Sequence, residues 1–286
     1  MVRMGYTRKQ SKRNPKLPKN IGPSQCHPRL NSVSEGCLPA KILTDAVKSL
    51  NLKAAGSPRK ALEAHLGVQP GNERSFLMAL PISTDIKDRL EKEYLRPAMP
   101  EEWKNDPDTW LDSNNIADVL NQYEEAYPKF EFMGPFPIDF AAPDPYNKMV
   151  QKCLMTEICE LRIAKALQNG TESIGIVYNL DPHFKSGSHW VANFIDIKNK
   201  QCYYFDSYGM EPPPQVAKFM KWLTTQDPGM KLSYSSRRLQ YKNTECGVYS
   251  TYFIIRMLLG ESFTNFSRRK PTDSDMLQLR KCMFST

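Results

Sequence analysis

Apolar residues recur at helical spacing in the first third of the chain. Residues 39–50 (PAKILTDAVKSL) place Ile, Leu, Ala and Val side chains along one face, which predicts an amphipathic helix. Residues 57–67 (SPRKALEAHLG) begin with serine and proline and end with glycine, the usual start and stop signals of a helix. A third helix is predicted to end at Leu95. The proline-rich, charged segment 96–110 is typical of a linker, so we place a domain boundary near residue 105.

From residue 106 onward, strand patterns occur among the helical ones. Helices are predicted at 114–127, 146–168, 215–226 and 246–260 and from Thr272 onward, and strands at 173–180, at 231–241 and as a pair within 187–209. Strands and helices are segregated and do not alternate strictly. The predicted fold class is therefore α+β.

The composition is that of a soluble globular protein. The chain has 286 residues, of which 40% are hydrophobic and 24% are charged. Its longest apolar run is interrupted by Arg256 and is too short to cross a bilayer, so no membrane partner is expected. No apolar segment follows the basic N-terminus, which argues against a signal peptide.

Most of the net charge of +8 comes from residues 1–20, which contain seven Lys and Arg residues and no acid. Basic blocks of this kind are usually disordered and solvated, and we predict a disordered tail. A contact with nucleic acid or another polyanion is the alternative, since each neutralised phosphate releases counterions.

The seven cysteines are odd in number and lack framework spacing, which predicts a reducing compartment. A thiol there serves as buried filler, metal ligand or nucleophile. Two sets were weighed as zinc ligands: Cys26 and His27 with Cys37, and Cys153 with Cys159. Neither has the paired C-x-x-C spacing of a structural zinc site, so no metal and no cofactor is expected.

Cys246 is the candidate nucleophile. It opens the nearly all-apolar helix, directly after the polar residues KNTE. A helix N-terminus carries partial positive charge, which stabilises a thiolate. Gly247 would let another backbone approach the sulfur closely.

His189 and Asp206 are the candidate base and orienting acid. His189 precedes the first strand of the pair within 187–209 and Asp206 follows the second, so antiparallel pairing brings both to one sheet edge. Asp206 can then fix the tautomer of His189. A lone histidine before a strand is more often structural. The amide of Gln240 and the backbone N–H of Cys246 could both donate to an oxyanion.

These motifs resemble the SUMO-protease and adenovirus-protease superfamily of cysteine proteases. The resemblance lies in the order His-Trp, Asp, Gln-x5-Cys-Gly and in TWLDSNNIADVLNQY, which is similar to that family's W-L-N-D-x-x-I motif. SGSHWVANFIDI and TECGVYS are similar to the polyprotein-processing proteases of African swine fever virus and other large DNA viruses. The resemblance covers residues 109 to about 260. It implies a papain-like fold in the permuted His-Asp-Cys order with an N-terminal helical arm.

The resemblance also implies domains and residue roles. The domains are a basic tail (1–20), a helical arm (21–105) and a cysteine protease catalytic domain (106–286). The roles are base for His189, orienter for Asp206, nucleophile for Cys246, oxyanion donor for Gln240, and walls of a narrow Gly-Gly tunnel for Trp110 and Trp190 beside Gly247. The chain departs from the W-L-N-D motif at Asp112 and Ser113, directly after Trp110 and Leu111.

The function implied is a viral cysteine endopeptidase that cleaves structural precursor proteins after Gly-Gly-type sites during virion maturation. It would act in the virion and the host cytoplasm, without a cofactor. Three alternatives stay open. They are a deconjugating protease for ubiquitin-like proteins, an acetyltransferase on the same fold, and a non-catalytic polyanion-binding protein.

Overall fold

The computed structural model describes residues 2–4, 21–30, 35–53, 56–145 and 152–286. The chain forms two compact units, one built from Asp108–Leu277 with strand β1 (Val2–Met4) and the other from Lys19–Pro107 with Gln278–Thr286. Apart from β1, the basic segment 1–20 lies outside the described residues, and its predicted disorder and polyanion contact stay predictions. No helix of the described residues is long and apolar enough to cross a membrane.

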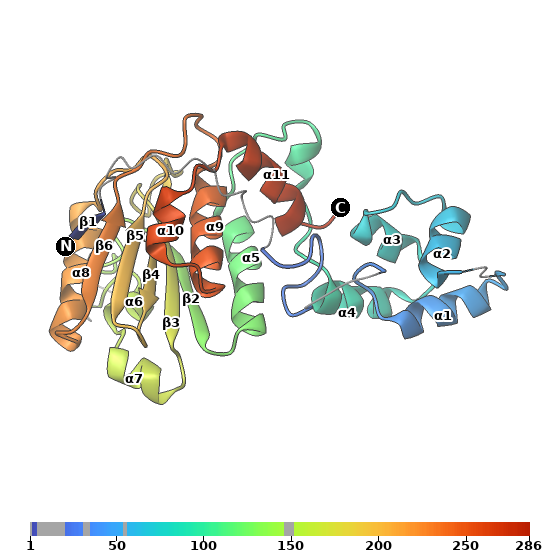
Figure 1. The fold of residues 1–286 in the computed structure, drawn as a ribbon, viewed down its shortest axis with the longest axis horizontal. Helices are drawn as coiled ribbons and strands as arrows, with labels where there is room; N and C mark the ends of the chain where they lie inside the picture. Colours follow the sequence, from blue (N-terminus) through green and yellow to red (C-terminus); the bar gives the residue numbers. More distant parts are fainter. Residues whose placement is uncertain (1, 5–20, 31–34, 54–55, 146–151) are drawn as a thin grey trace. The chain divides into compact units, whose positions relative to one another are not determined.

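A mixed sheet of six strands, in the order β1-β6-β5-β4-β3-β2, lies at the centre of the larger unit (Figure 1). The strands after β1 are β2 (Phe130–Pro137), β3 (Ser173–Asn179), β4 (Trp190–Asp196), β5 (Gln201–Phe205) and β6 (Lys231–Ser235). β3, β4 and β5 are antiparallel neighbours, whereas β2, β6 and β1 join in parallel. β3 and β4 are buried along almost their whole length, which explains their nearly continuous apolar sequences.

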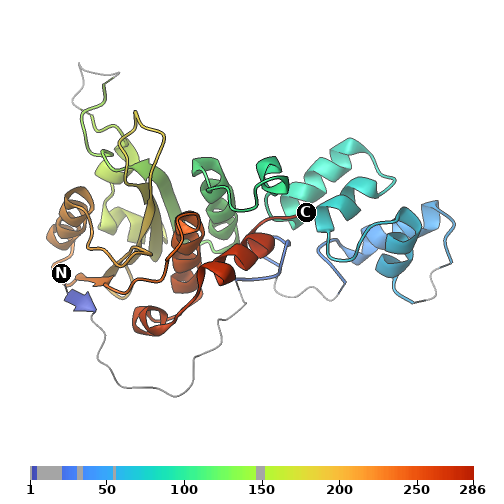
Figure 2. The ribbon, with the colours of Figure 1, turned by 90° about the horizontal axis from the view of Figure 1, so that it is seen from above.

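Helices cover both faces of this sheet (Figure 2). Helix α8 (Pro214–Gln226) packs its apolar side into a core that includes Ile174 and Ile176 of β3. Gly175, between them, points to the other face, where an added Cβ would lie 2.8 Å from Ile254 of helix α9 (Cys246–Leu258). Helix α5 (Ser113–Ala126) lies beside α9 and packs on β2. Every residue of α9 except Arg256 and Leu258 is buried.

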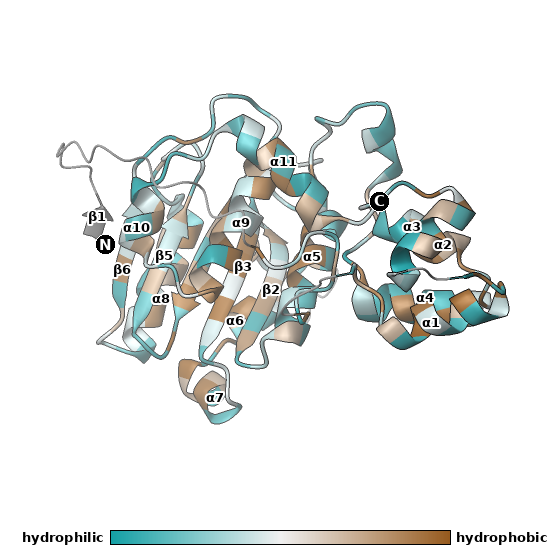
Figure 3. Cartoon of the chain, turned by 45° about the vertical axis from the view of Figure 1, so that its right-hand side comes forward, coloured by the Kyte–Doolittle hydropathy of each residue, from teal (hydrophilic) through white to brown (hydrophobic). Residues whose placement is uncertain are grey.

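The smaller unit is helical. It contains α1 (Ala40–Ser49), α2 (Pro58–Leu66), α3 (Glu73–Ala79), α4 (Thr84–Tyr94) and the 3-10 turn η1 (Glu101–Lys104). The three helices predicted here are confirmed, and α3 was missed. Figure 3 shows these helices with brown positions on one side and teal on the other, as amphipathic helices require.

The segment Gln278–Thr286 completes the smaller unit, although the sequence assigned it to the catalytic domain. The backbone N–H of Arg74 donates to the carbonyl of Thr286 at 2.8 Å, and that of Ser285 donates to Pro97 at 2.8 Å. Trp103 packs edge-on against the ring of Phe284 at 5.0 Å. Helix α11 (Asp273–Met283) therefore begins in one unit and ends in the other.

Four cysteines are paired, which corrects the prediction of unpaired thiols in a reducing compartment. The disulfides are Cys26–Cys37 and Cys153–Cys159, the same cysteines that were weighed as zinc ligands. The helix predicted over 146–168 is also wrong in its described part. Only α6 (Thr156–Cys159) and α7 (Ile163–Gln168) form there.

A further helix was missed, and one strand is shorter than predicted. α10 (Phe263–Arg268) was not predicted, and the strand expected over 231–241 ends at Ser235. The final helix begins as predicted, since Thr272 and Asp275 exchange hydrogen bonds of 2.8 and 3.2 Å as a capping pair.

A buried ion pair holds the smaller unit together between α2 and α3. The guanidinium of Arg59 donates to both carboxylate oxygens of Glu73, at 2.9 and 3.1 Å, and to Glu63 at 2.6 Å. Glu73 also accepts from the backbone N–H of Cys37 at 3.1 Å, and the guanidinium lies 3.7 Å over the ring of Phe76. The guanidinium of Arg59 and the carboxylate of Glu73 are thus both hydrogen-bonded within the described residues.

We expect Glu73→Ala to lower the free energy of unfolding by about 3 kcal/mol, because it leaves the buried Arg59 without its main partner. Urea unfolding followed by circular dichroism measures the change. Glu101→Ala is the matched control, since it breaks an exposed pair with Lys104 and should cost less than about 1 kcal/mol. Equal losses for the two variants would contradict the role assigned to burial.

Candidate active site

Cys246 is the first residue of α9 and is 2% exposed. Helix α9 packs on β3 and β4, and this packing fixes the position of its first residue. Ser250, one turn further on, donates to the carbonyl of Trp190 at 3.1 Å and ties the helix to the start of β4. The backbone N–H groups of the first turn have no acceptor within the helix, so they can serve an anion at this end.

His189 and Asp206 lie just beyond the paired ends of β4 and β5, where Ala192 faces Phe205. The structure brings the two side chains together, with Nε2 of His189 2.8 Å from Oδ1 of Asp206. Asp206 is buried, and the side chain of His189 is 11% exposed. Cys246 is close enough to His189 to raise the pKa of its ring. Since Nε2 is engaged by Asp206, Nδ1 is the ring nitrogen left for the sulfur.

The environment of His189 favours its charged form. Burial by itself would lower the pKa of His189, because it disfavours an imidazolium. The hydrogen bonds and charges of Asp206 and Cys246 outweigh burial and raise the pKa of His189 from 6.5 to about 9. The ring is therefore protonated at neutral pH, as suits the partner of a thiolate.

Tyr208 supports the same histidine and was missed by the sequence analysis. Its ring stacks on that of His189, with centroids 4.6 Å apart and planes 15° from parallel. Its backbone N–H donates to Oδ1 of Asp206 at 2.8 Å, the oxygen that also contacts His189. The only available signal was its place two residues after Asp206, which gives no hint of stacking.

Gln240 is fully buried and held at both ends of its amide. Its Oε1 accepts from the hydroxyl of Ser207 at 2.6 Å, and its Nε2 donates to the carbonyl of Lys242 at 2.8 Å. The backbone N–H groups of Leu239 and Gln240 both donate to the carbonyl of Ser207. A carboxamide nitrogen has two hydrogens, so one N–H of Gln240 remains for an oxyanion.

Trp190, the first residue of β4, packs against the segment before α5. It is 6% exposed, and its indole N–H donates to the carbonyl of Leu111 at 2.9 Å. Gly247 packs against both, since a Cβ there would lie 2.9 Å from Leu111 and 3.3 Å from Trp190. Close packing within the protein therefore accounts for this glycine, whereas the sequence analysis assigned it to the approach of a substrate.

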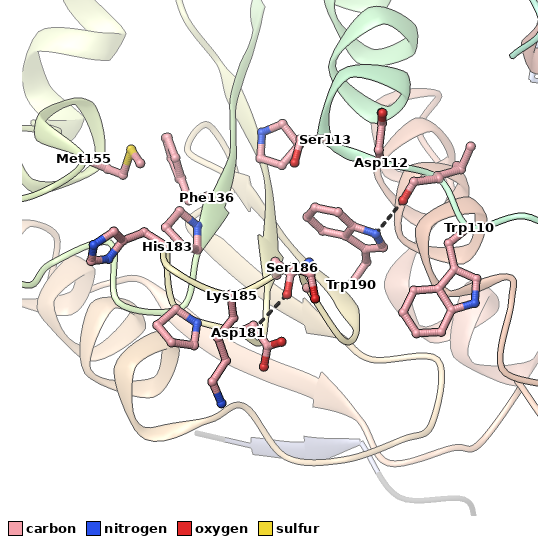
Figure 4. A pocket seen from close by; sticks show the side chains of 16 residues that line it. Trp110, Asp112, Ser113, Phe136, Met155, Asp181, His183, Lys185, Ser186 and Trp190 are labelled. Atoms are coloured by element: carbon pink, nitrogen blue, oxygen red, sulfur yellow. Dashed lines mark hydrogen bonds between the residues drawn. The ribbon is translucent and has the colours of Figure 1, made fainter.

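Trp110 is 41% exposed and, with Trp190, lines a cavity of about 370 Å³ (Figure 4). Both indoles lie on one side of the cavity in that view, and Phe136, Met155 and His183 lie on the other. Cys246 and His189 are not among the lining residues, and Trp190, which follows His189 directly in the chain, is the lining residue next to them in sequence. Asp112, at the departure from the W-L-N-D motif, caps α5 in a reciprocal pair with Asn115.

No group of three His, Cys, Asp or Glu side chains in the described parts of the chain could hold a metal ion. What the site does hold is a buried thiol, a protonated imidazole, a carboxylate and spare N–H donors. This set can carry out nucleophilic attack by sulfur on a carbonyl, with the imidazole as proton donor to the leaving group.

The sequence is similar to one protease family model and to two viral proteases. The model of the Ulp1 protease family, C-terminal catalytic domain, matches residues 179–285. A thiol protease of Acanthamoeba polyphaga mimivirus is 37% identical over 166 residues, 54% of this chain but only half of that protein. The SUMO-1 cysteine protease of African swine fever virus is 28% identical over 276 residues, 92% of this chain and 95% of its own.

The fold is also shared with a solved structure. The crystal structure of an African swine fever virus protease superposes with a TM-score of 0.66 at 22% identity, covering 92% of this chain and 96% of that chain. These findings confirm the α+β fold class and the resemblance stated from the motifs.

The raised pKa of His189 predicts how stability depends on pH. A histidine whose pKa rises from 6.5 to about 9 on folding stabilises the protein fully below pH 6.5 and loses that contribution as pH rises through 9. The free energy of unfolding of the wild type, relative to His189→Ala, should fall over this range. Urea unfolding at a series of pH values measures it, and a difference that grows with pH would contradict the assignment.

Proposed function

We propose that the chain is a cysteine protease of the Ulp1 type, an endopeptidase that cleaves viral structural precursors at Gly-Gly-type sites during virion maturation. The observation that carries this proposal is the buried contact between His189 and Asp206 beside the thiol at the start of α9. Both relatives named above are viral proteins. The site of action that follows is the virion and the cytoplasm of the host.

In the proposed mechanism, Sγ of Cys246 attacks the carbonyl carbon of the scissile bond. His189 gives its proton to the leaving amine, and a thioester with Cys246 remains. A water then attacks the thioester, with His189 as base, and the carboxylic acid product leaves. Asp206 keeps Nε2 engaged throughout, so that Nδ1 faces the sulfur.

The negative charge that develops on the carbonyl oxygen needs donors in place before the reaction. The spare N–H of Gln240 and the backbone N–H of Cys246 are the two candidates. Ser207 and Lys242 hold the amide of Gln240 in one orientation, and this removes the cost of ordering it at the moment of reaction.

The two tryptophans supply the proposed preference for glycine. Trp190 is fixed by Leu111 and Gly247, while Trp110 is partly exposed beside the same cavity. A backbone that passes between two indoles has no room for a Cβ, and glycine alone lacks one. Upstream side chains would then enter the cavity beyond the pair.

Deconjugation of a ubiquitin-like protein is the second candidate, because the African swine fever virus relative is named a SUMO-1 cysteine protease. The chemistry is the same and only the substrate differs. A folded ubiquitin-like protein ending in Gly-Gly, presented as an isopeptide conjugate, distinguishes it from a linear precursor with an internal Gly-Gly site. Faster cleavage of the conjugate would favour this second function.

The residue roles predict a graded loss of activity. We expect Cys246→Ala and His189→Ala each to lower kcat by about 10⁴-fold or more on a Gly-Gly peptide, because the residues act as a unit. Asp206→Asn should retain more activity than either. Cys202→Ala is the matched control, a buried free thiol in β5 outside the site, and should keep wild-type kcat. Wild-type cleavage by Cys246→Ala would overturn the proposed function.

Gln240→Ala should lower kcat by roughly 10²-fold with little change in substrate affinity, as for other single oxyanion donors. Because the side chain is buried, its effect on the melting temperature is measured in parallel. A loss confined to KM would assign Gln240 to substrate binding.

Trp110 offers the cleaner test of the glycine preference, because Trp190 also holds the local packing. Replacing the last glycine before the cut by alanine should lower kcat/KM of the wild type steeply, by about 10²-fold for a blocked backbone path. Trp110→Ala should lower kcat/KM for the Gly-Gly peptide and narrow the gap between the two peptides. A library screen that returns a large residue directly before the cut would contradict the tunnel.

A further inference from the structure

Two basic segments contact each other, and one of them lies next to Tyr208, the residue that stacks on His189. We call them the basic surface, and its members are Arg237, Arg238, Lys242, Arg268 and Lys270. The guanidinium of Arg237 donates to the carbonyl of Arg268 at 3.1 Å, which brings the two segments into contact. None of the five residues lines the cavity beside Trp110 and Trp190.

Arg238 is the member closest to the reacting groups. Its guanidinium lies 5.2 Å from the ring centre of Tyr208, which in turn stacks on His189. It also lies 5.1 Å from the ring centre of Tyr241, and its Nε donates to the carbonyl of Gln240 at 2.8 Å. The exposed cation is thus fixed between two aromatic rings, one ring away from the catalytic imidazole.

Much of the positive charge of this surface faces solvent, since Arg238, Lys242, Arg268 and Lys270 are exposed residues. No carboxylate within the described residues forms an ion pair with Arg238, Lys242, Arg268 or Lys270. Two carboxylates of the neighbouring segment accept hydrogen bonds from other groups. Asp273 accepts from the backbone N–H groups of Tyr241 and Lys242 and from the hydroxyl of Tyr249, and Asp275 caps α11.

The position relative to His189 indicates which part of a substrate passes here. This argument rests on the proposed function, in which His189 protonates the leaving amine. The chain downstream of the cut therefore leaves past the groups that flank His189. Trp190 and the cavity flank the upstream side, so the downstream chain runs over Tyr208 toward Arg238.

We propose that the basic surface binds acidic residues of the protein substrate a few positions downstream of the scissile bond. The expected partner is an extended polypeptide segment that carries Asp or Glu, with apolar residues between them. Tyr241, in one of the two basic segments, is 73% exposed. Met210 is 63% exposed in the neighbouring loop, where Gly209 packs on the backbone of Arg237 and Arg238. Both side chains offer apolar contacts. A purely electrostatic surface for a nucleic acid would have no use for an exposed methionine.

Cleavage of matched peptides tests the proposal. Three peptides share a Gly-Gly site and differ only at the second to fourth positions after the cut, which hold Glu, Gln or Lys. The wild type should cleave the Glu peptide with a kcat/KM about 3- to 10-fold above that of the Gln peptide and cleave the Lys peptide most slowly. The preference should shrink as salt is raised from about 50 mM to 500 mM.

Charge exchange at Arg238 assigns the effect to this residue. Arg238→Gln should bring the ratio of kcat/KM for the Glu and Gln peptides close to 1, and Arg238→Glu should favour the Lys peptide. Arg162→Gln is the matched control, because that arginine, which directly precedes α7 in the same unit, also lies over an aromatic ring, 5.5 Å from the ring centre of Trp222. It should leave all three rates unchanged.

Binding to Cys246→Ala, read by fluorescence anisotropy of the labelled peptides, gives the answer without cleavage. Tighter binding of the Glu peptide that Arg238→Gln removes would support the basic surface even if the proposed peptidase function failed. Equal rates and equal binding for the three peptides would overturn the inference while leaving that function intact. A short DNA duplex bound through Arg238, with no preference among the peptides, would overturn it in favour of nucleic acid.

Discussion

The burial of α9 against β3 and β4 determines where the reacting sulfur lies. A helix buried on nearly all sides cannot slide or rotate without opening voids against both strands. Gly175 allows the close approach at the middle of the helix, and Ser250 bonds to the carbonyl of Trp190 at its beginning. Since His189 directly precedes Trp190, the contact that seats the helix also sets the thiol beside the imidazole.

The catalytic groups are held by residues that do no chemistry themselves. Asp206 is oriented by the turn after β5, in which Ser207 accepts two backbone hydrogen bonds from the segment that carries Gln240. Tyr208 then covers one face of His189, and its N–H shares the oxygen of Asp206. The proposed base, orienter and oxyanion donor thus lie in one hydrogen-bonded group of loops, which reduces the freedom of each.

Local patterns in the sequence predicted the elements of the site, and contacts between distant loops escaped them. The apolar run after Cys246 and the strands around His189 and Asp206 were visible because burial on both sides leaves a periodic or continuous pattern. Tyr208 stacks on a residue 19 positions before it, and Arg238 lies over a ring 30 positions before it. No local period records such contacts.

The helix predicted over 146–168 failed for a geometric reason. Six residues of helix span about 9 Å, whereas the α-carbons of Cys153 and Cys159 are 6.5 Å apart in their disulfide. Only short helices form in the described part of this segment, α6 within the disulfide loop and α7 after it, because tertiary structure overrides helical propensity there.

The helical arm is discontinuous in the sequence, and this has a consequence for biosynthesis. Segment 278–286 supplies Phe284 and Ser285 to the interior of the smaller unit, yet the whole catalytic unit precedes it in the chain. A ribosome must therefore translate every strand of the sheet before the first helices made can complete their own core. The first helices of the arm therefore expose part of their apolar surface until segment 278–286 has been made.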